Sequence, residues 1–332
     1  MSLGASDAGS PQSHPSSVTA VFRQIVEGQP SDPSLDEGVL ATLDRNDLLG
    51  EWLGLLPGEA LREQRWRGQF RRIQFGAMQL AATGATVSST LQDGGVPHVV
   101  YKGVATTALL GHDWHRRQSA DVDVLVSRSR LEGALSVLAD AGWRVVDGYH
   151  VPNRLRSYAY CELSLDRAGI LVDLHWRVNA SPLVLRIPTE TLIESAVDTS
   201  LGTSTVPTLN TEHDALVTAV HGTRELWLKE KFILDLARAV SVLDPVYLRR
   251  LAVDAGAEKA LAIGCAALFE LAPNAVPDAL RPGTKASRRW QEMRQASPNP
   301  LTRRVLKARS RDSLASGLDD LARSIVGQVV PT

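Results

Sequence analysis

The sequence is poor in cysteine, has almost no net charge and contains no long apolar run. Only Cys161 and Cys265 occur in 332 residues, and neither stands in a partner motif. This excludes a cysteine-rich zinc site and a disulfide framework, and a reducing cytoplasmic location is expected. The formal net charge of −1 argues against attraction of the whole protein to nucleic acid or acidic membranes. We expect neither a signal peptide nor a membrane partner, because the basic start and the apolar runs that these require are lacking.

Composition divides the chain into five parts. Residues 1–16 are rich in Ser, Gly and Pro, which predicts a disordered tail. Apolar residues at helical spacing predict an N-terminal helical region over residues 17–92. Strand and helix patterns alternate over residues 93–210, and helical patterns return over 211–280. Residues 281–332 form a basic tail that either contacts an anionic partner such as nucleic acid or is a partly ordered helix with a solvated face.

Short apolar runs predict a sheet in the middle of the chain. The predicted strands are 98–102, 121–126, 143–147, 158–165 and 170–176, with helices over 103–110 and 130–141. Strands alternate with helices and then end in a hairpin, so the sheet should be mixed rather than wholly parallel. We predict an α+β fold in which a small mixed sheet is flanked by N-terminal helices and a C-terminal helical domain.

Two aspartates share one strand in the run Ala120-Asp-Val-Asp-Val-Leu-Val126. Because side chains alternate along a strand, Asp121 and Asp123 should point to one face, with the valines in the core. Two adjacent carboxylates repel each other unless a cation lies between them. Since hard oxygen ligands suit Mg²⁺ or Mn²⁺, this pair predicts a divalent-metal site.

A third carboxylate, Asp173, stands in the middle of the apolar strand 170–176. A lone aspartate is costly to bury unless it is paired or bound to a metal. If its strand neighbours that of Asp121, three carboxylates converge. Two of them would hold metal ions that bridge the phosphates of a nucleotide. The third would bind a metal or accept the proton of an attacking hydroxyl.

The order of these motifs resembles the nucleotidyltransferase superfamily of the DNA polymerase β type. Lys102-Gly103 is followed by Arg117, by the Asp121 motif and by Val172-Asp-Leu-His-Trp176. More narrowly, the chain resembles the bacterial uncharacterised nucleotidyltransferase family over roughly residues 70–270. The resemblance implies a mixed-sheet nucleotidyltransferase core carrying the carboxylates. It also implies a helical domain closing over the nucleotide, and transfer of a nucleotidyl group with two Mg²⁺ ions.

The resemblance also assigns residues to roles. Asp121 and Asp123 match the metal-binding pair, and Asp173 matches the third carboxylate of the catalytic set. Gly103 matches the turn beside the phosphates. Val104 departs from the pattern, because many superfamily members carry there a serine that touches the phosphates.

Four cationic residues are expected to bind the nucleotide. Lys102 is either a phosphate contact or the cap of a surface strand, and Arg117 either reaches phosphate or pairs with Asp113. Lys229 and Lys231 either hold the triphosphate, as lysines do in related enzymes, or form the exposed face of a helix.

Two other polar residues are expected to be structural. His175 should point away from the face of Asp173 and pack in the core or behind the site. Asp235 stands among apolar residues of a helix predicted over 227–240, and should bond within the helical domain.

The predicted activity is nucleotidyl transfer, in which an acceptor hydroxyl attacks the α-phosphate of an NTP and pyrophosphate leaves. The acceptor would be a small molecule, a peptide or a protein. Two other interpretations keep the fold: a glycosyltransferase that uses a nucleotide sugar to tailor a natural product, and a non-catalytic nucleotide-binding module. The sequence leaves open the nucleotide, the acceptor and the oligomeric state.

Overall fold

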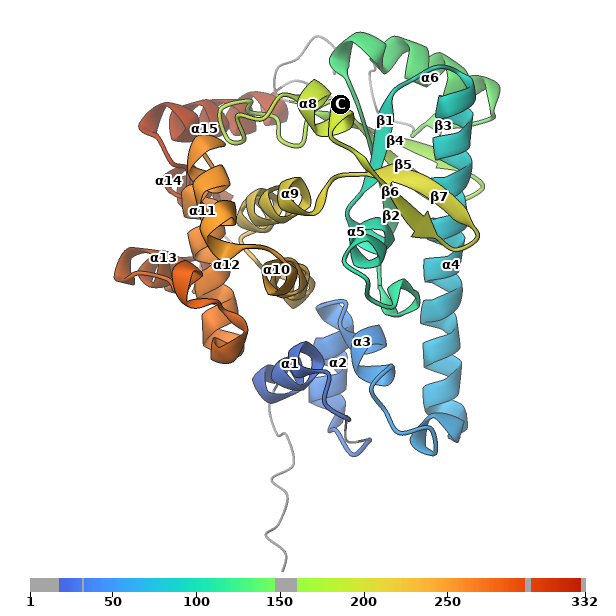
Figure 1. Ribbon diagram of the computed structural model, residues 1–332, viewed down its shortest axis with the longest axis vertical. Helices are drawn as coiled ribbons and strands as arrows, with labels where there is room; N and C mark the ends of the chain where they lie inside the picture. Colours follow the sequence, from blue (N-terminus) through green and yellow to red (C-terminus); the bar gives the residue numbers. More distant parts are fainter. Residues whose placement is uncertain (1–17, 32, 147–159, 296–299, 330–332) are drawn as a thin grey trace, which may run out of the picture.

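A mixed sheet lies beside a larger C-terminal helical region, and a small N-terminal group of helices packs against that region (Figure 1). The computed structural model describes residues 18–31, 33–146, 160–295 and 300–329. The tail predicted over 1–16 lies outside the described residues, as do the end of the strand predicted over 143–147 and the start of that predicted over 158–165. Among the described helices, none has the length and apolar character needed to cross a bilayer.

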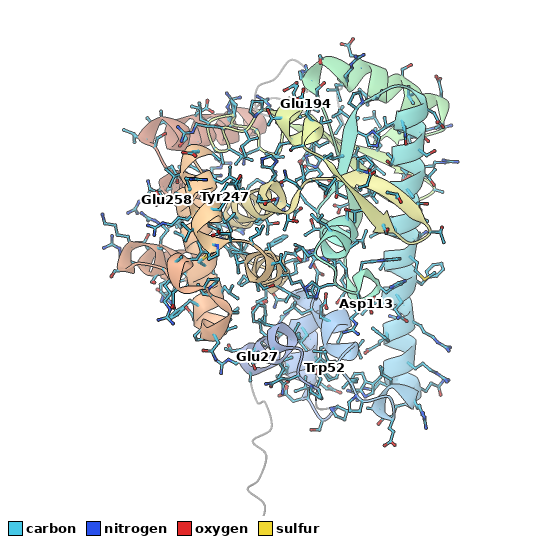
Figure 2. The ribbon with its side chains drawn as sticks, viewed as in Figure 1. Glu27, Trp52, Asp113, Glu194, Tyr247 and Glu258 are labelled. Carbon is cyan, nitrogen blue, oxygen red and sulfur yellow. The ribbon has the colours of Figure 1, made fainter. Side chains whose placement is uncertain are left out.

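Three short helices open the N-terminal region: α1 (Val18–Glu27), α2 (Glu37–Arg45) and α3 (Leu49–Leu53). Asp36 begins α2 by accepting a hydrogen bond from the backbone N–H of Val39 at 2.9 Å, which satisfies a free donor of the first turn. Trp52 of α3 is fully buried (Figure 2), and its ring centroid lies 5.1 Å from that of Trp66. This edge-to-face contact joins α3 to the start of the next helix.

The long helix α4 (Gln64–Asp93) runs from the N-terminal helices to the sheet (Figure 1). Its second half packs under the sheet through Ala77, Leu80, Val87 and Leu91. This helix corresponds to the end of the helical region predicted over residues 17–92. A separate 3-10 turn, Ala60–Arg62, precedes it.

Five strands form the sheet in the order β1-β2-β5-β4-β3. They are β1 (His98–Tyr101), β2 (Asp121–Val126), β3 (Arg144–Val145), β4 (Glu162–Arg167) and β5 (Ile170–His175). Strands β2 and β5 pair in parallel and the other neighbours are antiparallel, so the predicted mixed sheet is confirmed. Helix α5 (Gly103–Leu109) follows β1, and α6 (Leu131–Asp140) follows β2.

Alternation along the strands separates the two faces of the sheet. Val122 and Val124 of β2 are buried with α4 and α6 on one face, together with Val172 and Leu174 of β5. The opposite face carries the aspartates of both strands. One face therefore anchors the sheet in a dry core, and the other is free to present polar side chains.

A hairpin that was not expected from the sequence follows the sheet. It comes after helix α8 (Thr189–Glu194) and consists of β6 (Val197–Leu201) and β7 (Ser204–Thr208). The hairpin packs beside β1, α4 and α5, and Leu201 and Val206 are buried in the same core as the central strands. It thus extends the layer that supports the site.

The C-terminal region is helical, as predicted. It contains α9 (Thr211–Arg224), α10 (Glu230–Val242), α11 (Pro245–Asp254), α12 (Glu258–Leu271), α13 (Thr284–Arg294), α14 (Pro300–Arg309) and α15 (Leu314–Val329). The last three lie in the segment predicted as a basic tail. Trp290, Met293 and Leu306 of that segment are buried in one core with α9, α10 and α12. Much of the predicted tail is therefore part of the folded C-terminal region.

Candidate functional site

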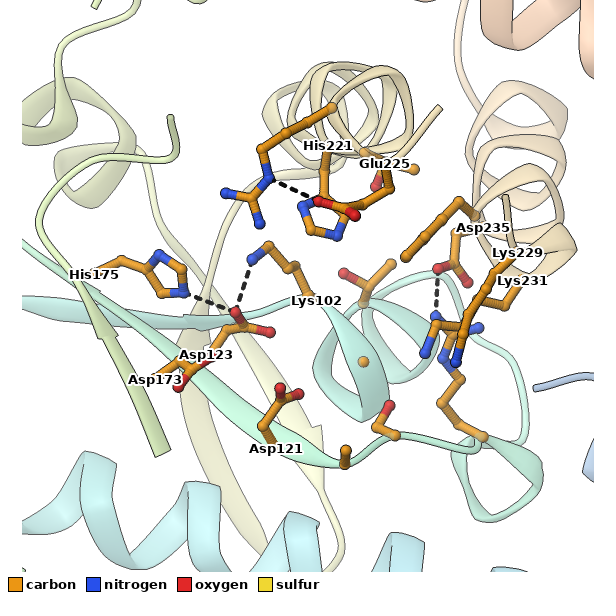
Figure 3. Close-up of a pocket in the computed structure, with 18 of the residues that line it drawn as sticks. Lys102, Asp121, Asp123, Asp173, His175, His221, Glu225, Lys229, Lys231 and Asp235 are labelled. Atoms are coloured by element: carbon orange, nitrogen blue, oxygen red, sulfur yellow. Dashed lines mark hydrogen bonds and ion pairs between the residues drawn. The ribbon is translucent and has the colours of Figure 1, made fainter. Parts of the chain in front are cut away.

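A cavity of about 440 Å³ opens between the polar face of the sheet and helices α9 and α10 (Figure 3). The structure brings all eight residues predicted for the site to this one cavity: Lys102, Gly103, Arg117, Asp121, Asp123, Asp173, Lys229 and Lys231. Residues that lie far apart in the chain thus line the same cavity. The sheet supplies the carboxylates, and the turn after β1 and the start of α10 supply cations.

The three aspartates meet through the parallel pairing of β2 and β5. Asp123 lies directly opposite Asp173 in the register, and Asp121 stands two residues before Asp123 on the same face. Asp173 is oriented by β4, since the Ser164 hydroxyl donates a hydrogen bond to its Oδ1 at 2.6 Å. Figure 3 shows the three carboxylates grouped at the base of the cavity.

His175 belongs to this group, contrary to the sequence prediction. The prediction that it points away from Asp173 is wrong because residues i and i+2 of a strand lie on the same face. Its Nε2 lies 2.8 Å from Asp123 Oδ1, and its Nδ1 lies 3.1 Å from Glu162 Oε2. With 1% of its surface exposed, His175 is a buried link between two carboxylates.

Asp123 is the most strongly compensated of the carboxylates. Its Oδ1 accepts a hydrogen bond from Lys102 Nζ at 2.7 Å as well as the contact from His175 (Figure 3). Burial raises the pKa of Asp123, but Lys102 and His175 more than offset it and hold the pKa far below its usual range. Burial and Lys102 lower the pKa of His175, but its hydrogen bonds to Asp123 and Cys161 and the charge of Glu162 raise it to about 9. His175 is therefore an imidazolium at neutral pH.

Asp121 lacks such compensation. Burial, followed by the negative charges of Asp123 and Asp173, raises the pKa of Asp121 to about 6. Ionising Asp121 next to the other two carboxylates therefore costs free energy. An additional cation next to Asp121 would remove that cost.

The donor set fits a divalent cation. Ligand atoms of Asp123, Asp173 and His175 all lie within 4.8 Å of one another. Because a protonated imidazole has no free lone pair, the ligands would be the oxygens of Asp123 and Asp173, and Asp121 adds a further oxygen from the strand of Asp123. Carboxylate oxygens are the ligands that Mg²⁺ and Mn²⁺ prefer. Lys102 now takes up part of the coordinating capacity of Asp123, so a metal at this oxygen would share it with the lysine or displace the lysine.

The turn that begins α5 has an unusual backbone. Lys102 adopts φ 60° and ψ −175°, a region that essentially only glycine occupies without strain, and Gly103 adopts φ 49°. A Cβ at Gly103 would meet Ser119 Oγ at 3.0 Å, so the turn also lies close to the loop before β2. Val104, the position that departs from the superfamily pattern described above, is 4% exposed and packs in the sheet core. It presents no polar group to a phosphate.

Arg117 does not pair with Asp113, which instead contacts His115 and Arg116. Arg117 Nη2 lies 2.6 Å from Asp235 Oδ2, and both side chains are almost fully buried. The expectation that Asp235 bonds within the helical domain is also wrong, because this ion pair joins the loop before β2 to α10. Arg117 thus lines the cavity, and its ion pair connects the sheet side of the site to helix α10.

Lys229 and Lys231 meet at one acceptor. Each places Nζ 2.6 Å from Asp47 Oδ2, which lies between α2 and α3. The side chain of Lys231 is 15% exposed, so it does not belong to an exposed helix face, whereas that of Lys229 is 45% exposed. The N-terminal helices therefore contribute to the site by holding these lysines at its edge.

Sequence reasoning missed Glu162 and Arg224, which also line the cavity. Glu162 stands opposite His175 in the β4–β5 register, and Arg224 Nη1 lies 3.8 Å from Glu162 Oε2. Glu162 could have been suspected from the sequence, because it is a polar residue at the start of an alternating strand. That pattern points to the site only once the strand is known to pair with the strand of Asp173.

One family model matches this chain, and two solved structures show a low similarity to it. Residues 48–273 match the model of the uncharacterised nucleotidyltransferase family. No curated protein matches the sequence. The crystal structure of ANT(2″)-Ia in complex with adenylyl-2″-tobramycin is 14% identical, with a TM-score of 0.39 over 53% of this chain and 95% of that one. The solution structure of the antibiotic-resistance factor ANT(2″)-Ia is also 14% identical, with a TM-score of 0.37 over 51% and 86%.

The family match spans more than half of the chain and contains all eight predicted site residues. The protein belongs to the uncharacterised nucleotidyltransferase family.

Proposed function

We propose that this protein transfers a nucleoside monophosphate from an NTP, such as ATP, to a hydroxyl of an acceptor, by the chemistry of polymerase β-type nucleotidyltransferases. The observation that carries the proposal is the convergence of Asp121, Asp123 and Asp173 on one sheet face, in a cavity that Lys102, Lys229 and Lys231 also line. The acceptor oxygen forms a bond to the α-phosphorus, the bond from that phosphorus to the bridging oxygen breaks, and pyrophosphate leaves.

The three aspartates would hold Mg²⁺ or Mn²⁺. When bound, the metal neutralises the charge that builds up on the α-phosphate and on the leaving pyrophosphate. Asp123 is ionised at neutral pH, because Lys102 and His175 hold its pKa low. The site therefore keeps an anionic ligand at neutral pH.

Three lysines that line the cavity, Lys102, Lys229 and Lys231, would bind the triphosphate. The backbone of Gly103 and the ammonium of Lys102 flank the carboxylates on one side, and Lys231 and Lys229 reach the cavity from the start of α10. Arg117 is 3% exposed and paired with Asp235, so it would attract the triphosphate through its charge and not through a direct contact. Positioning and charge neutralisation would thus supply most of the catalysis.

Asp173 would be the carboxylate next to the acceptor. It lies on the side of the carboxylate group that faces β4, with its Oδ1 fixed by Ser164. From there it would bind a metal or accept the proton of the attacking hydroxyl. The nucleotide would then occupy the side of β1 and α10, and the acceptor the side of β4.

Product analysis by mass spectrometry tests the proposal. The protein is incubated with Mg²⁺, each NTP or nucleotide sugar in turn, and a panel of hydroxyl acceptors. A mass gain of one nucleoside monophosphate is expected, together with one pyrophosphate released per product. A gain of one hexose from the nucleotide sugars would overturn the proposal in favour of glycosyl transfer.

Calorimetry separates catalysis from binding alone. Wild type should bind Mg²⁺ with a non-hydrolysable NTP analogue, and Asp121→Asn should lose that binding. Asp140→Asn is the matched control, because this exposed carboxylate on α6 is remote in sequence from the site strands. Tight binding with no product across the whole panel would indicate a non-catalytic nucleotide-binding module.

A further inference from the structure

The long helix α4 lies along one edge of the molecule, and its two sides differ (Figure 1). The inner side carries Trp66 and Leu80, which are buried in the two hydrophobic cores. The outer side carries Arg67, Arg71 and Phe75, which are exposed and stand four positions apart on one face of the helix. We call the exposed residues that continue this spacing the α4 face: Arg67, Arg71, Phe75, Met78, Ala82 and Thr86.

The start of the α4 face is cationic. The first nine residues of α4 contain four arginines, and the one acidic residue of the helix is Asp93, at its last position. In the part of the chain that the structure describes, no ion pair involves Arg67, Arg71 or Arg72. Arg67 and Arg71 are one helical turn apart, and like charges at this spacing destabilise a helix. A carboxylate bound beside them would relieve the repulsion.

The middle of the α4 face is apolar and exposed. Phe75 is 68% exposed and Met78 is 52% exposed, and they stand three positions apart. A Cβ added at Gly68 or Gly76 would meet no heavy atom within 4 Å, so this stretch of the helix borders open space. Adjoining large apolar side chains left in water are typical of interaction sites.

The end of the α4 face lines a groove of about 590 Å³. Met78, Ala82 and Thr86 contribute to one wall, and the turn between β6 and β7 contributes the other through Gly202 and Thr203. Among the described residues that line this groove, none is charged. The groove therefore suits uncharged side chains, and it begins where the exposed Met78 stands.

This order of chemistry favours an acidic peptide segment over other anionic partners. A nucleic-acid strand carries a phosphate at every nucleotide, so along the α4 face it would place phosphates over the uncharged groove. A membrane surface is too broad to enter a groove between a helix and a hairpin. A peptide with carboxylates at one end and apolar side chains at the other matches both parts of the face.

We propose that the α4 face binds an acidic peptide segment of a partner protein. Its carboxylates contact Arg67 and Arg71, and its apolar side chains pack on Phe75 and in the groove. From Arg67 to Thr86 the helix rises about 28 Å, which an extended peptide of about nine residues covers. No residue of the α4 face lines the carboxylate cavity, so this inference does not depend on nucleotidyl transfer.

Selection from a display library of random twelve-residue peptides tests the surface, with the full-length protein as bait. Enriched peptides are synthesised, and their affinities are measured by fluorescence anisotropy. We expect them to combine aspartate or glutamate with leucine, isoleucine or phenylalanine, and to bind more weakly as the salt concentration rises. A selection that enriches no peptide, or peptides without acidic residues, would overturn the proposal.

Two double substitutions test the two parts of the face. Arg67→Gln/Arg71→Gln removes the charge, and Phe75→Ala/Met78→Ala removes the apolar surface. Each should raise the Kd of the best enriched peptide at least about tenfold. All four side chains are exposed, so the variants should remain folded, which their melting temperatures check. A Kd that neither variant changes would contradict the proposal.

Helix α11 supplies matched controls, because it also exposes two arginines and two large apolar side chains. Arg249→Gln/Arg250→Gln and Val246→Ala/Tyr247→Ala make the same kinds of change there. Both controls should leave the Kd within about twofold of wild type. If they weaken binding as much as the α4 variants do, the α4 face is not the binding site.

Two further probes test the class of partner. An oligonucleotide of twelve thymidines should bind more weakly than the best peptide, and so should phosphatidylglycerol vesicles. Tighter binding of either probe that is lost in Arg67→Gln/Arg71→Gln would overturn the peptide in favour of nucleic acid or a membrane surface. None of these results bears on nucleotidyl transfer, since no substituted residue lines the carboxylate cavity.

Discussion

Lys102 bridges the first two strands of the sheet by donating a hydrogen bond from Nζ to Asp123 Oδ1 at 2.7 Å. It does so from a backbone conformation, φ 60° and ψ −175°, that strongly favours glycine. The strained turn thus aims an ammonium at a carboxylate of the site. Backbone strain of this kind persists where the surrounding structure holds it in place.

Two substitutions at Lys102 separate the strain from the charge. Both Lys102→Gly and Lys102→Met remove the ammonium, but only glycine relieves the backbone. Relief of about 1–3 kcal/mol exceeds the entropy cost of glycine, about 0.5–1 kcal/mol, so Lys102→Gly should be the more stable by roughly 1 kcal/mol. Urea denaturation measures the difference. If the turn is unstrained, Lys102→Gly should instead be less stable than Lys102→Met, by the entropy cost of glycine of about 0.5–1 kcal/mol.

Removing one carboxylate should stabilise the metal-free protein and abolish its response to metal. Asp121→Asn relieves repulsion with Asp123 and Asp173, the charges that help to raise the pKa of Asp121. In EDTA we expect a gain of about 1 kcal/mol in the free energy of unfolding. Mg²⁺ with an NTP analogue should raise the melting temperature of wild type and of Asp140→Asn only. A metal response retained by Asp121→Asn would exclude Asp121 as a ligand.

Removing only one member of the buried pair Arg117–Asp235 should lower the stability of the protein strongly. Arg117→Met or Asp235→Asn leaves a buried partner without its counter-charge, which costs about 3–5 kcal/mol of stability. The double variant Arg117→Met/Asp235→Leu should lose much less than the sum of its two single changes. Chemical denaturation of the full cycle measures this. Arg281→Ala, which removes an exposed pair with Asp278, is the control and should change stability by less than about 0.5 kcal/mol.

Asp214 should make stability fall as the pH rises. Burial raises the pKa of Asp214 to about 7 from 3.8, although the hydrogen bond from Thr106 Oγ1 lowers it. The folded state then binds a proton that the unfolded state releases near pH 4. The free energy of unfolding should therefore decrease from about pH 4 to pH 7.

Asp214→Asn removes this dependence and keeps an oxygen for Thr106. At pH 8 the variant should be more stable than wild type by about 4 kcal/mol, with little difference at pH 4. Urea denaturation at the two pH values measures it, with exposed Asp254→Asn as the control. A difference that is the same at both pH values would show that Asp214 does not titrate between them.

Local sequence pattern determined the elements that carry the chemistry. Alternation placed Asp121 and Asp123 on one face of β2, and the glycine at 103 marked the turn before α5. These features depend on a few neighbouring residues, so a single sequence contains them. The order of the motifs also sufficed for the resemblance to the family that the chain matches.

Tertiary structure alone decided which side chains meet. Arg117 pairs with Asp235 and both lysines of α10 meet Asp47, because packing brings together segments that lie far apart in the chain. The β4–β5 register, which local pattern does not specify, set Glu162 beside His175. The same long-range packing turned part of a basic tail into the wall of a cavity next to the carboxylates, since buried apolar residues such as Met293 and Leu306 hold that segment in the helical core.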